Sequence, residues 1–294
     1  MTVRFTYSIG MPDPDLYLPL ARAAEEAGWD TISIPDSICY PKESSSRYPY
    51  SSDGSREFLE NKPFIEPFSL VPYMAAVTTD IDFLVAVLKL PVRHPVLVAK
   101  QVASVAVLTG NRFQLGVGTS PWPDDYEICG VPWEERGRRL DEGVAIVREL
   151  VAGGYAEHHG AIYDVPAVKL EPVPTRPVPI LVGGQSEAAL RRAARLGDGW
   201  ISAGSTEEVL VDQIRRLRRQ REDAGRADEP FRIHVRAPQG ATADGVQHLA
   251  ELGVTDVVMR FQDTYTVHPD DDALGVRLDA LRRYADDVIV AVRG

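Results

Sequence analysis

Residues 82–118 read DFLVAVLKLPVRHPVLVAKQVASVAVLTGNRFQLGVG. Two short runs rich in apolar and β-branched residues, 82–87 and 112–117, flank a longer segment, 94–108, which we expect to form a helix. A strand, a helix and a second strand in this order make a βαβ unit, in which the two strands are parallel. This stretch therefore predicts a parallel sheet covered by helices.

The same alternation of short apolar runs with longer amphipathic stretches repeats along all 294 residues. About 250 residues suffice for eight such pairs in one barrel. We therefore predict an α/β fold, a single (β/α)₈ TIM-barrel domain over residues 1–294, with insertions after strand 2 and before strand 5. The eight predicted strands are 5–9, 31–35, 82–87, 112–117, 179–182, 199–203, 231–236 and 256–261.

The charge balance narrows the partners that the chain can have. Acidic residues outnumber basic ones, 43 to 32, which gives a formal net charge of -11 and disfavours nucleic acid and anionic membranes. The two cysteines, Cys39 and Cys129, form no CxxC and no zinc-spaced cluster, so we expect neither a disulfide framework nor a metal site. The N-terminal residues show no targeting pattern. A cytoplasmic protein with a small-molecule substrate is expected.

Two connections exceed the usual two to six residues, 36–67 after the second strand and 153–177 before the fifth. The first is rich in Pro, Ser and Tyr and lies on the face that carries barrel active sites, so we predict a lid, with a plain surface loop as the alternative. The second alternates enough to form a hairpin. We expect Tyr40, Trp122 and Tyr126 to line the substrate pocket, with lid packing as the alternative for the last two.

Polar residues and glycines follow several predicted strands, where a barrel collects its catalytic groups. Asp36 follows the second strand and either contacts a ring N–H or hydroxyl of a ligand or caps the next segment. At the end of the fourth strand, Gly116 and Gly118 allow a ligand to approach the backbone closely. Thr119 and Ser120 add hydroxyl groups there. These strand ends predict a binding site.

The fifth predicted strand ends in Gly183 and Gly184, and a helix starts near Ser186. Backbone N–H groups at a helix N-terminus bind anions without a lysine, and a tight turn capped by Ser186 is the alternative. The next strand end, residues 201–206, adds another glycine and two hydroxyl groups. Together the two ends predict a phosphate site.

No GxGxxG fingerprint, GxSxG elbow, P-loop or HExxH motif occurs, so a cofactor is expected to supply the reactivity. A cofactor-free isomerase or aldolase would need a Schiff-base lysine or a metal. Lys89 and Lys169 are the lysines in or near predicted barrel strands. This alternative has few candidate residues.

Three segments resemble the luciferase-like monooxygenase superfamily, and within it the coenzyme F420-dependent oxidoreductase branch. They are LPVRHPVLVAKQVASVAVLTGNRFQLGVGTSPW, GVPWEERGRRLDEG and PVPILVGGQSEAALRRAARLGDGW, and the resemblance extends to about Trp200. It implies a barrel with a flavin-like ring at its mouth, and a bulge with a non-prolyl cis peptide at Ala86 and Val87. The residues implied to bind the cofactor are Asp36, Ala86, Val87, Thr119, Gly183, Gly184, Gln185, Ser186, Gly204 and Ser205.

The resemblance also implies a reaction: transfer of hydride between coenzyme F420 and an unknown small organic substrate, in a homodimer. A monooxygenase that uses FMN and a barrel that binds the cofactor without catalysis are the alternatives. Relatives often carry His after the acid at the second strand end, whereas this chain has Ser37. Asp36 and Ser37 are therefore the predicted catalytic residues, with Tyr40 or water as alternative proton donors.

Overall fold

The computed structural model describes residues 2–44, 46–48, 54, 56–262 and 273–294. Eight parallel strands close into a barrel in the order β1-β10-β9-β8-β7-β4-β3-β2, which confirms the predicted fold class. Each predicted strand is present, with ends within two residues of the expected ones. The barrel strands are β1 (Arg4–Ser8), β2 (Thr31–Ile34), β3 (Asp82–Lys89), β4 (Phe113–Gly118), β7 (Ile180–Gly183), β8 (Gly199–Ile201), β9 (Arg232–Val235) and β10 (Asp256–Met259).

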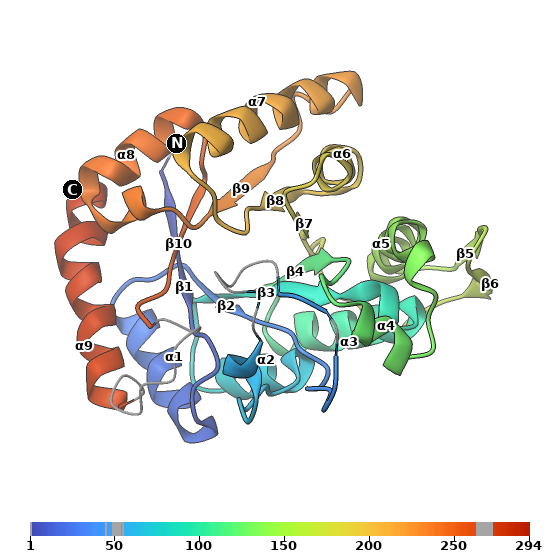
Figure 1. The fold of residues 1–294 in the computed structure, drawn as a ribbon, viewed down its shortest axis with the longest axis horizontal. Coiled ribbons are helices and arrows are strands. Elements are labelled where there is room, and N and C mark those ends of the chain that lie inside the picture. The colour runs from blue at the N-terminus through green and yellow to red at the C-terminus, as the bar shows by residue number, and fades with distance from the viewer. Residues whose placement is uncertain (1, 45, 49–53, 55, 263–272) are drawn as a thin grey trace.

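Helices surround the barrel strands (Figure 1). Their apolar faces pack on the sheet, as the buried Leu140, Val144 and Val147 of α5 show. The helices described are α1 (Tyr17–Glu26), α2 (Pro67–Ala75), α3 (Pro95–Leu108), α4 (Pro123–Ile128), α5 (Arg136–Ala152), α6 (Glu187–Leu196), α7 (Glu207–Asp223), α8 (Ala243–Leu252), α9 (Leu274–Tyr284) and α10 (Val290–Arg293). Short 3-10 turns accompany them, among them η2 (Glu57–Leu59) and η5 (Pro238–Ala241).

The second long connection contains an antiparallel hairpin, as predicted. Its strands β5 (Ala156–His159) and β6 (Asp164–Val168) project beyond α5, away from the barrel (Figure 1). The Glu142 carboxylate of α5 accepts hydrogen bonds from the backbone N–H groups of Ala161, Ile162 and Tyr163. These contacts hold the hairpin turn on α5, so this insertion has a structural role.

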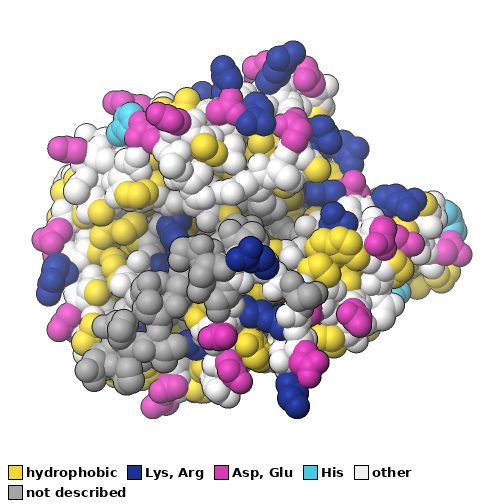
Figure 2. Space-filling view, viewed as in Figure 1, with side chains coloured by type: hydrophobic (Ala, Val, Ile, Leu, Met, Phe, Trp, Pro, Cys, Tyr) yellow, Lys and Arg dark blue, Asp and Glu magenta, His cyan; other side chains and the backbone are white. Residues whose placement is uncertain are grey.

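Helix length and surface charge give two further observations. None of the helices in the described ranges is long and apolar enough to cross a membrane. On the face shown in Figure 2, Lys and Arg side chains are interspersed with Asp and Glu around the rim. That face therefore lacks the continuous basic surface on which binding to a phosphate backbone depends.

A polar network fills the barrel at the N-terminal ends of its strands. Arg4 of β1 pairs with Asp82 of β3 at 2.7 Å, and Asp82 also accepts a hydrogen bond from Gln114 of β4. Arg232 of β9 donates to Gln114 at 2.8 Å. These contacts link strands across the barrel, and the N-terminal face of such barrels serves stability rather than catalysis.

At the opposite end, β3 carries a bulge that shifts its register against β4 between Val85 and Leu88. The Ala86–Val87 peptide bond is cis, as the resemblance implied. A Cβ on Gly116 would lie 2.2 Å from the Val85 carbonyl oxygen, so β4 approaches the bulge at a distance that only glycine permits. This close approach fixes the shape of the barrel mouth.

Gly116→Ala tests that close approach. The added methyl group must displace backbone rather than a flexible side chain, so we expect a loss of about 1 to 3 kcal/mol in the free energy of unfolding. Urea unfolding followed by far-UV circular dichroism measures it. Gly275→Ala in the exposed first turn of α9 is the control, because nothing lies within 4 Å of its new methyl group. Equal midpoints for the two variants would contradict the packing argument.

A second prediction concerns His234, which is fully buried inside the barrel. Burial lowers the pKa of His234 to about 4, because the charged imidazolium is poorly solvated there. The unfolded chain, with a pKa near 6.5, then binds the proton more tightly than the folded chain. Stability should therefore fall by up to about 3 kcal/mol as the pH drops from 6.5 to 4.

Unfolding free energies at pH 7, 5.5 and 4 test the His234 prediction. His234→Gln should flatten the loss over this pH range, whereas the control His159→Gln, in the exposed hairpin, should retain it. A wild-type slope that survives in His234→Gln would show that other groups cause the loss.

Candidate active site

The Asp36 carboxylate, directly after β2, is completely buried and fully engaged. Both of its oxygens receive N–H groups of Arg93, at 2.8 and 2.9 Å, and Oδ2 also accepts the Lys89 backbone N–H at 2.9 Å. Bidentate pairs of this kind are the strong, geometrically specific ion pairs. Asp36 therefore ties the end of β2 to the bulge of β3, and its carboxylate has no exposed atom to offer a ligand.

Lys89, the last residue of β3, forms a second buried ion pair. Its Nζ lies 2.8 Å from Asp125 Oδ2 of α4, and the two side chains are only 8% and 6% exposed. Ser120, with a positive φ of 58°, donates its hydroxyl to the same carboxylate oxygen. The end of β3 and the segment after β4 thus meet at the Asp125 carboxylate.

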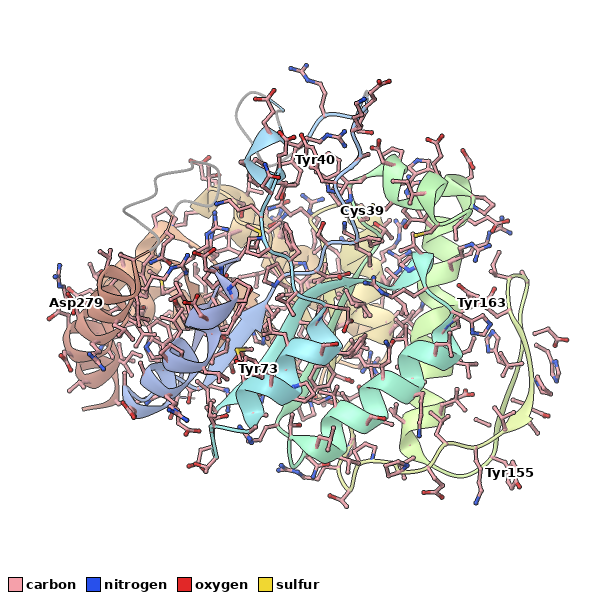
Figure 3. The ribbon with its side chains drawn as sticks, turned by 90° about the horizontal axis from the view of Figure 1, so that it is seen from below. Cys39, Tyr40, Tyr73, Tyr155, Tyr163 and Asp279 are labelled. Atoms are coloured by element: carbon pink, nitrogen blue, oxygen red, sulfur yellow. The ribbon has the colours of Figure 1, made fainter. Side chains whose placement is uncertain are left out.

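A small pocket opens beside this pair. Arg56, in the connection predicted to form a lid, lies against two aromatic rings, 5.3 Å from the ring centre of Tyr40 and 5.4 Å from that of Trp122. The Tyr48 ring stacks on the Trp122 indole, with 5.0 Å between the ring centres. Figure 3 shows Cys39 and Tyr40 near each other in the upper part of the view, away from Tyr155 at the lower right. The pocket is lined by Ser37, Cys39, Tyr40, Pro41, Arg56, Leu59, Lys89, Trp122, Asp124 and Asp125.

Of the predicted pocket residues, some line this pocket and one does not. Tyr40, Trp122 and Ser37 line the pocket, and the described part of the connection after β2 contributes one aromatic and one charged wall, Tyr40 and Arg56. Tyr126 does not line it: it is 1% exposed, its hydroxyl donates to the Thr119 carbonyl oxygen, and burial raises its pKa. Its position corresponds to the packing alternative.

Side chains around the bulge connect the pocket to the next two strand ends. Ala86 and Val87 are half-buried, whereas the residues before and after them in β3 are buried. A Cβ on Gly118 or on Gly183 would lie 2.7 Å from a methyl group of Val87. Both glycines thus have a packing reason to lack a side chain, and the Ala86–Val87 segment faces the barrel mouth beside them.

The loops after β7 and β8 lie against each other. Gly184 has a φ of 124°, which disfavours any side chain, and its carbonyl oxygen accepts the Trp200 indole N–H at 2.7 Å. The Gln185 side-chain amide donates to the Gly204 carbonyl oxygen. Ser186 caps α6 by accepting the Ala189 N–H at 3.2 Å, as the capping alternative predicted.

Ser205 is the unusual residue of this second cluster. Its hydroxyl oxygen is buried and finds no hydrogen-bond partner within the described part of the chain, just before α7 begins. Arg236 directly follows β9, and a Cβ on Gly204 would lie 3.7 Å from its carbonyl oxygen. Arg236 also has no ion pair among the described residues. An unpartnered hydroxyl and two helix N-termini suit an anion, and the Arg236 backbone passes beside them.

Several site residues were not predicted from the sequence: Arg56, Lys89, Arg93, Asp125 and Arg236. For Lys89 and Arg236 the sequence held a signal. A charged residue at the end of an apolar strand is rarely buried unless it pairs with another group or with a ligand at the barrel mouth. Arg93, Asp125 and Arg56 can be recognised only from their ion-pair partners, which are distant in the sequence.

A comparison of the chain with models of known protein families identifies one family. The model of the luciferase-like monooxygenase family matches residues 6–272. The chain belongs to this luciferase-like family.

Curated relatives of this luciferase-like protein include an uncharacterised protein of Mycobacterium tuberculosis. It is 52% identical over 290 residues, which cover 99% of this chain and 100% of the relative. An F420-dependent glucose-6-phosphate dehydrogenase of Nakamurella multipartita is 31% identical over 222 residues, or 72% of this chain and 60% of that protein. Sequence similarity therefore links this chain to a protein named as F420-dependent.

Solved structures share the fold of this luciferase-like chain at much lower identity. An F420-dependent secondary alcohol dehydrogenase, in complex with an F420–acetone adduct, superposes with a TM-score of 0.75 at 14% identity and covers 100% of both chains. Monooxygenase RslO1 from Streptomyces bottropensis also reaches 0.75, at 17% identity, over 98% of this chain and 99% of its own. Identities this low speak for the fold alone.

Asp36→Ala tests the role of the buried carboxylate. The substitution leaves the Lys89 N–H without a partner and the Arg93 guanidinium with only the Lys89 carbonyl oxygen, and loss of one member of a buried pair costs about 3 to 5 kcal/mol. A lower urea midpoint checks it. Asp212→Ala, which removes a solvent-exposed partner of Arg216, should leave the midpoint almost unchanged. An Asp36→Ala midpoint equal to that of the control would mean that the ion pair contributes little.

Proposed function

We propose that the chain is a coenzyme F420-dependent oxidoreductase that transfers hydride between the deazaflavin and a small organic substrate. The observation that carries the proposal is the buried, unpartnered Ser205 hydroxyl among the glycine loops after β7 and β8. A buried polar atom without a partner points to a missing hydrogen-bonding group, and both F420 and flavin nucleotides carry a phosphate. The F420-dependent relative at 31% identity favours the deazaflavin.

The residues present fit the phosphate of such a cofactor. Helices α6 and α7 begin beside these loops, and their first N–H groups and dipoles favour a negative charge. The Ser205 hydroxyl supplies a hydrogen bond and Arg236 a positive charge. Gly184 and Gly204, both with positive φ, leave the backbone accessible to the phosphate oxygens.

The ring would lie at the barrel mouth between this cradle and the pocket. Ala86 and Val87, half-buried on the bulge, would support one face of the ring, and Thr119 would contact its edge or its ribityl chain. When bound, a reduced deazaflavin supplies hydride, and the protein orients the reacting carbon and excludes water. Ser37 and Tyr40 lie where the substrate would be held, and Asp36 acts by positioning Arg93 and the bulge.

FMN is the second candidate cofactor, because its phosphate suits the same cradle and monooxygenase RslO1 shares the fold. In that case the mouth would serve oxygen activation by reduced flavin. Homodimerisation and a cytoplasmic location, which follow from the resemblance and the composition, stay predictions.

Parallel fluorescence titrations with oxidised F420 and with FMN at fixed salt test the proposal. We expect F420 to bind more tightly than FMN. Ser205→Ala and Arg236→Met should each weaken F420 binding by about 10- to 100-fold, because a hydrogen bond to a charged group contributes about 1.5 to 3 kcal/mol.

A deazaflavin chromophore without phosphate provides the matched control ligand. Its affinity should be equal for the wild-type protein and both variants, and Arg215→Met, on the exposed face of α7, should change neither titration. Tighter binding of FMN would make the monooxygenase the leading function. Binding of neither cofactor would reject both.

A further inference from the structure

We infer that Lys89, held in place by Asp125, is the group that exchanges a proton with the substrate, and that this substrate is an uncharged carbonyl compound. The inference rests on the proposed function and extends it. It addresses a gap in the site, because the residue after Asp36 is Ser37, which is a poor proton donor.

The other residues around the pocket are poorly suited to donating a proton. Asp36 is completely buried, with its oxygens bound to Arg93 and to the Lys89 N–H. The Tyr40 ring lies under the Arg56 guanidinium. The Ser37 hydroxyl lines the pocket but is a very weak acid at neutral pH. Two other described lining residues carry exchangeable protons: Arg56, whose guanidinium is a much weaker acid than an ammonium group, and Cys39, whose thiol pKa is raised by burial. Lys89 is therefore the donor that we infer.

Geometry places the Lys89 ammonium group at the reacting end of the pocket. The residue lies two positions after the Ala86–Val87 segment, where the cofactor ring is proposed to rest. Asp125 receives one N–H at 2.8 Å, and an ammonium group has three. The remaining N–H groups can hydrogen-bond to a ligand, while the buried carboxylate prevents the long side chain from turning away.

The reaction balances with this donor. The carbonyl carbon accepts a hydride from the reduced deazaflavin, so a C–H bond forms and the π electron pair of the C=O bond moves to oxygen. That oxygen takes a proton from Lys89, whose N–H bond breaks to leave a neutral amine. Solvent then returns a proton to the amine. The substrate is reduced by two electrons, the deazaflavin is oxidised, and alcohol oxidation follows the reverse path.

Charge in the pocket favours an uncharged substrate. Two cations line it, and each already faces a carboxylate: Lys89 faces Asp125, and Arg56 lies 3.7 Å from Asp124. A phosphate or carboxylate on the substrate would meet no unpaired cation there and would have to disrupt one of these pairs. The aromatic walls Tyr40 and Trp122 instead suit a flat, conjugated acceptor.

Lysine side-chain NMR tests the inference without turnover. The chain has only five lysines, so the ¹⁵Nζ signals can be assigned by substitution; they are Lys42, Lys62, Lys89, Lys100 and Lys169. With F420 binding monitored by fluorescence in the same sample, cyclohex-2-enone should shift the signal that Lys89→Arg removes. The signal removed by Lys100→Met, outside the pocket, should stay in place.

The two possible failures are distinguishable. Absence of F420 binding would reject the proposed function together with this inference. Normal F420 binding with an unmoved Lys89 signal would overturn the inference alone. A glucose 6-phosphate response as strong as that to cyclohex-2-enone would overturn the uncharged substrate class.

Kinetics with reduced F420 and cyclohex-2-enone separate proton donation from structural support. Lys89→Arg keeps the charge and the partner but removes the acidic ammonium, so kcat should fall at least about 100-fold while F420 affinity stays within about threefold. The double variant Lys89→Met/Asp125→Leu removes both buried charges together, which preserves folding better than a single loss. Wild-type kcat in Lys89→Arg would overturn the inference.

Discussion

The close approach of β4 to the bulge of β3 is the constraint on which the rest of the site depends. Gly116 brings the two strands together at a distance that excludes any side chain, and the register shift between Val85 and Leu88 redirects the last residues of β3. Because of this shift, the Lys89 N–H meets the Asp36 carboxylate and its ammonium group meets Asp125. One backbone irregularity therefore organises both buried ion pairs of the barrel mouth.

The two ends of the barrel use polar residues in different ways. At the N-terminal ends of the strands, Arg4, Asp82 and Gln114 bind one another and link strands across the interior. At the mouth, the Ser205 hydroxyl finds no described partner, and the pocket wall carries an ammonium group with N–H groups to spare. Unpartnered atoms also occur inside the barrel, among them Arg4 Nε and both His234 nitrogens, but only at the mouth can such an atom meet a ligand.

The ion pairs also explain why Asp36 is better described as a positioning residue than as an acid or base. A carboxylate that accepts three N–H groups inside the protein cannot turn toward a ligand without breaking a bidentate pair. The charge that does reach the pocket belongs to Lys89 and Arg56, and each is balanced by an aspartate of α4. Asp36 and Arg93 therefore shape the barrel mouth, whereas Lys89 and Arg56 are the charged groups that reach the pocket.

The sequence by itself determined the eight strands, the closed parallel fold, the hairpin and the helix cap at Ser186, because these follow from local periodicity, composition and capping chemistry. It also located the glycine loops and the bulge, through the resemblance. Only the tertiary structure decided that Asp36 binds Arg93, that Lys89 pairs with Asp125 and that Tyr126 packs away from the pocket. Those partners are separated along the chain, and their pairing depends on strand register and on the direction in which each loop leaves the barrel, which no local pattern encodes.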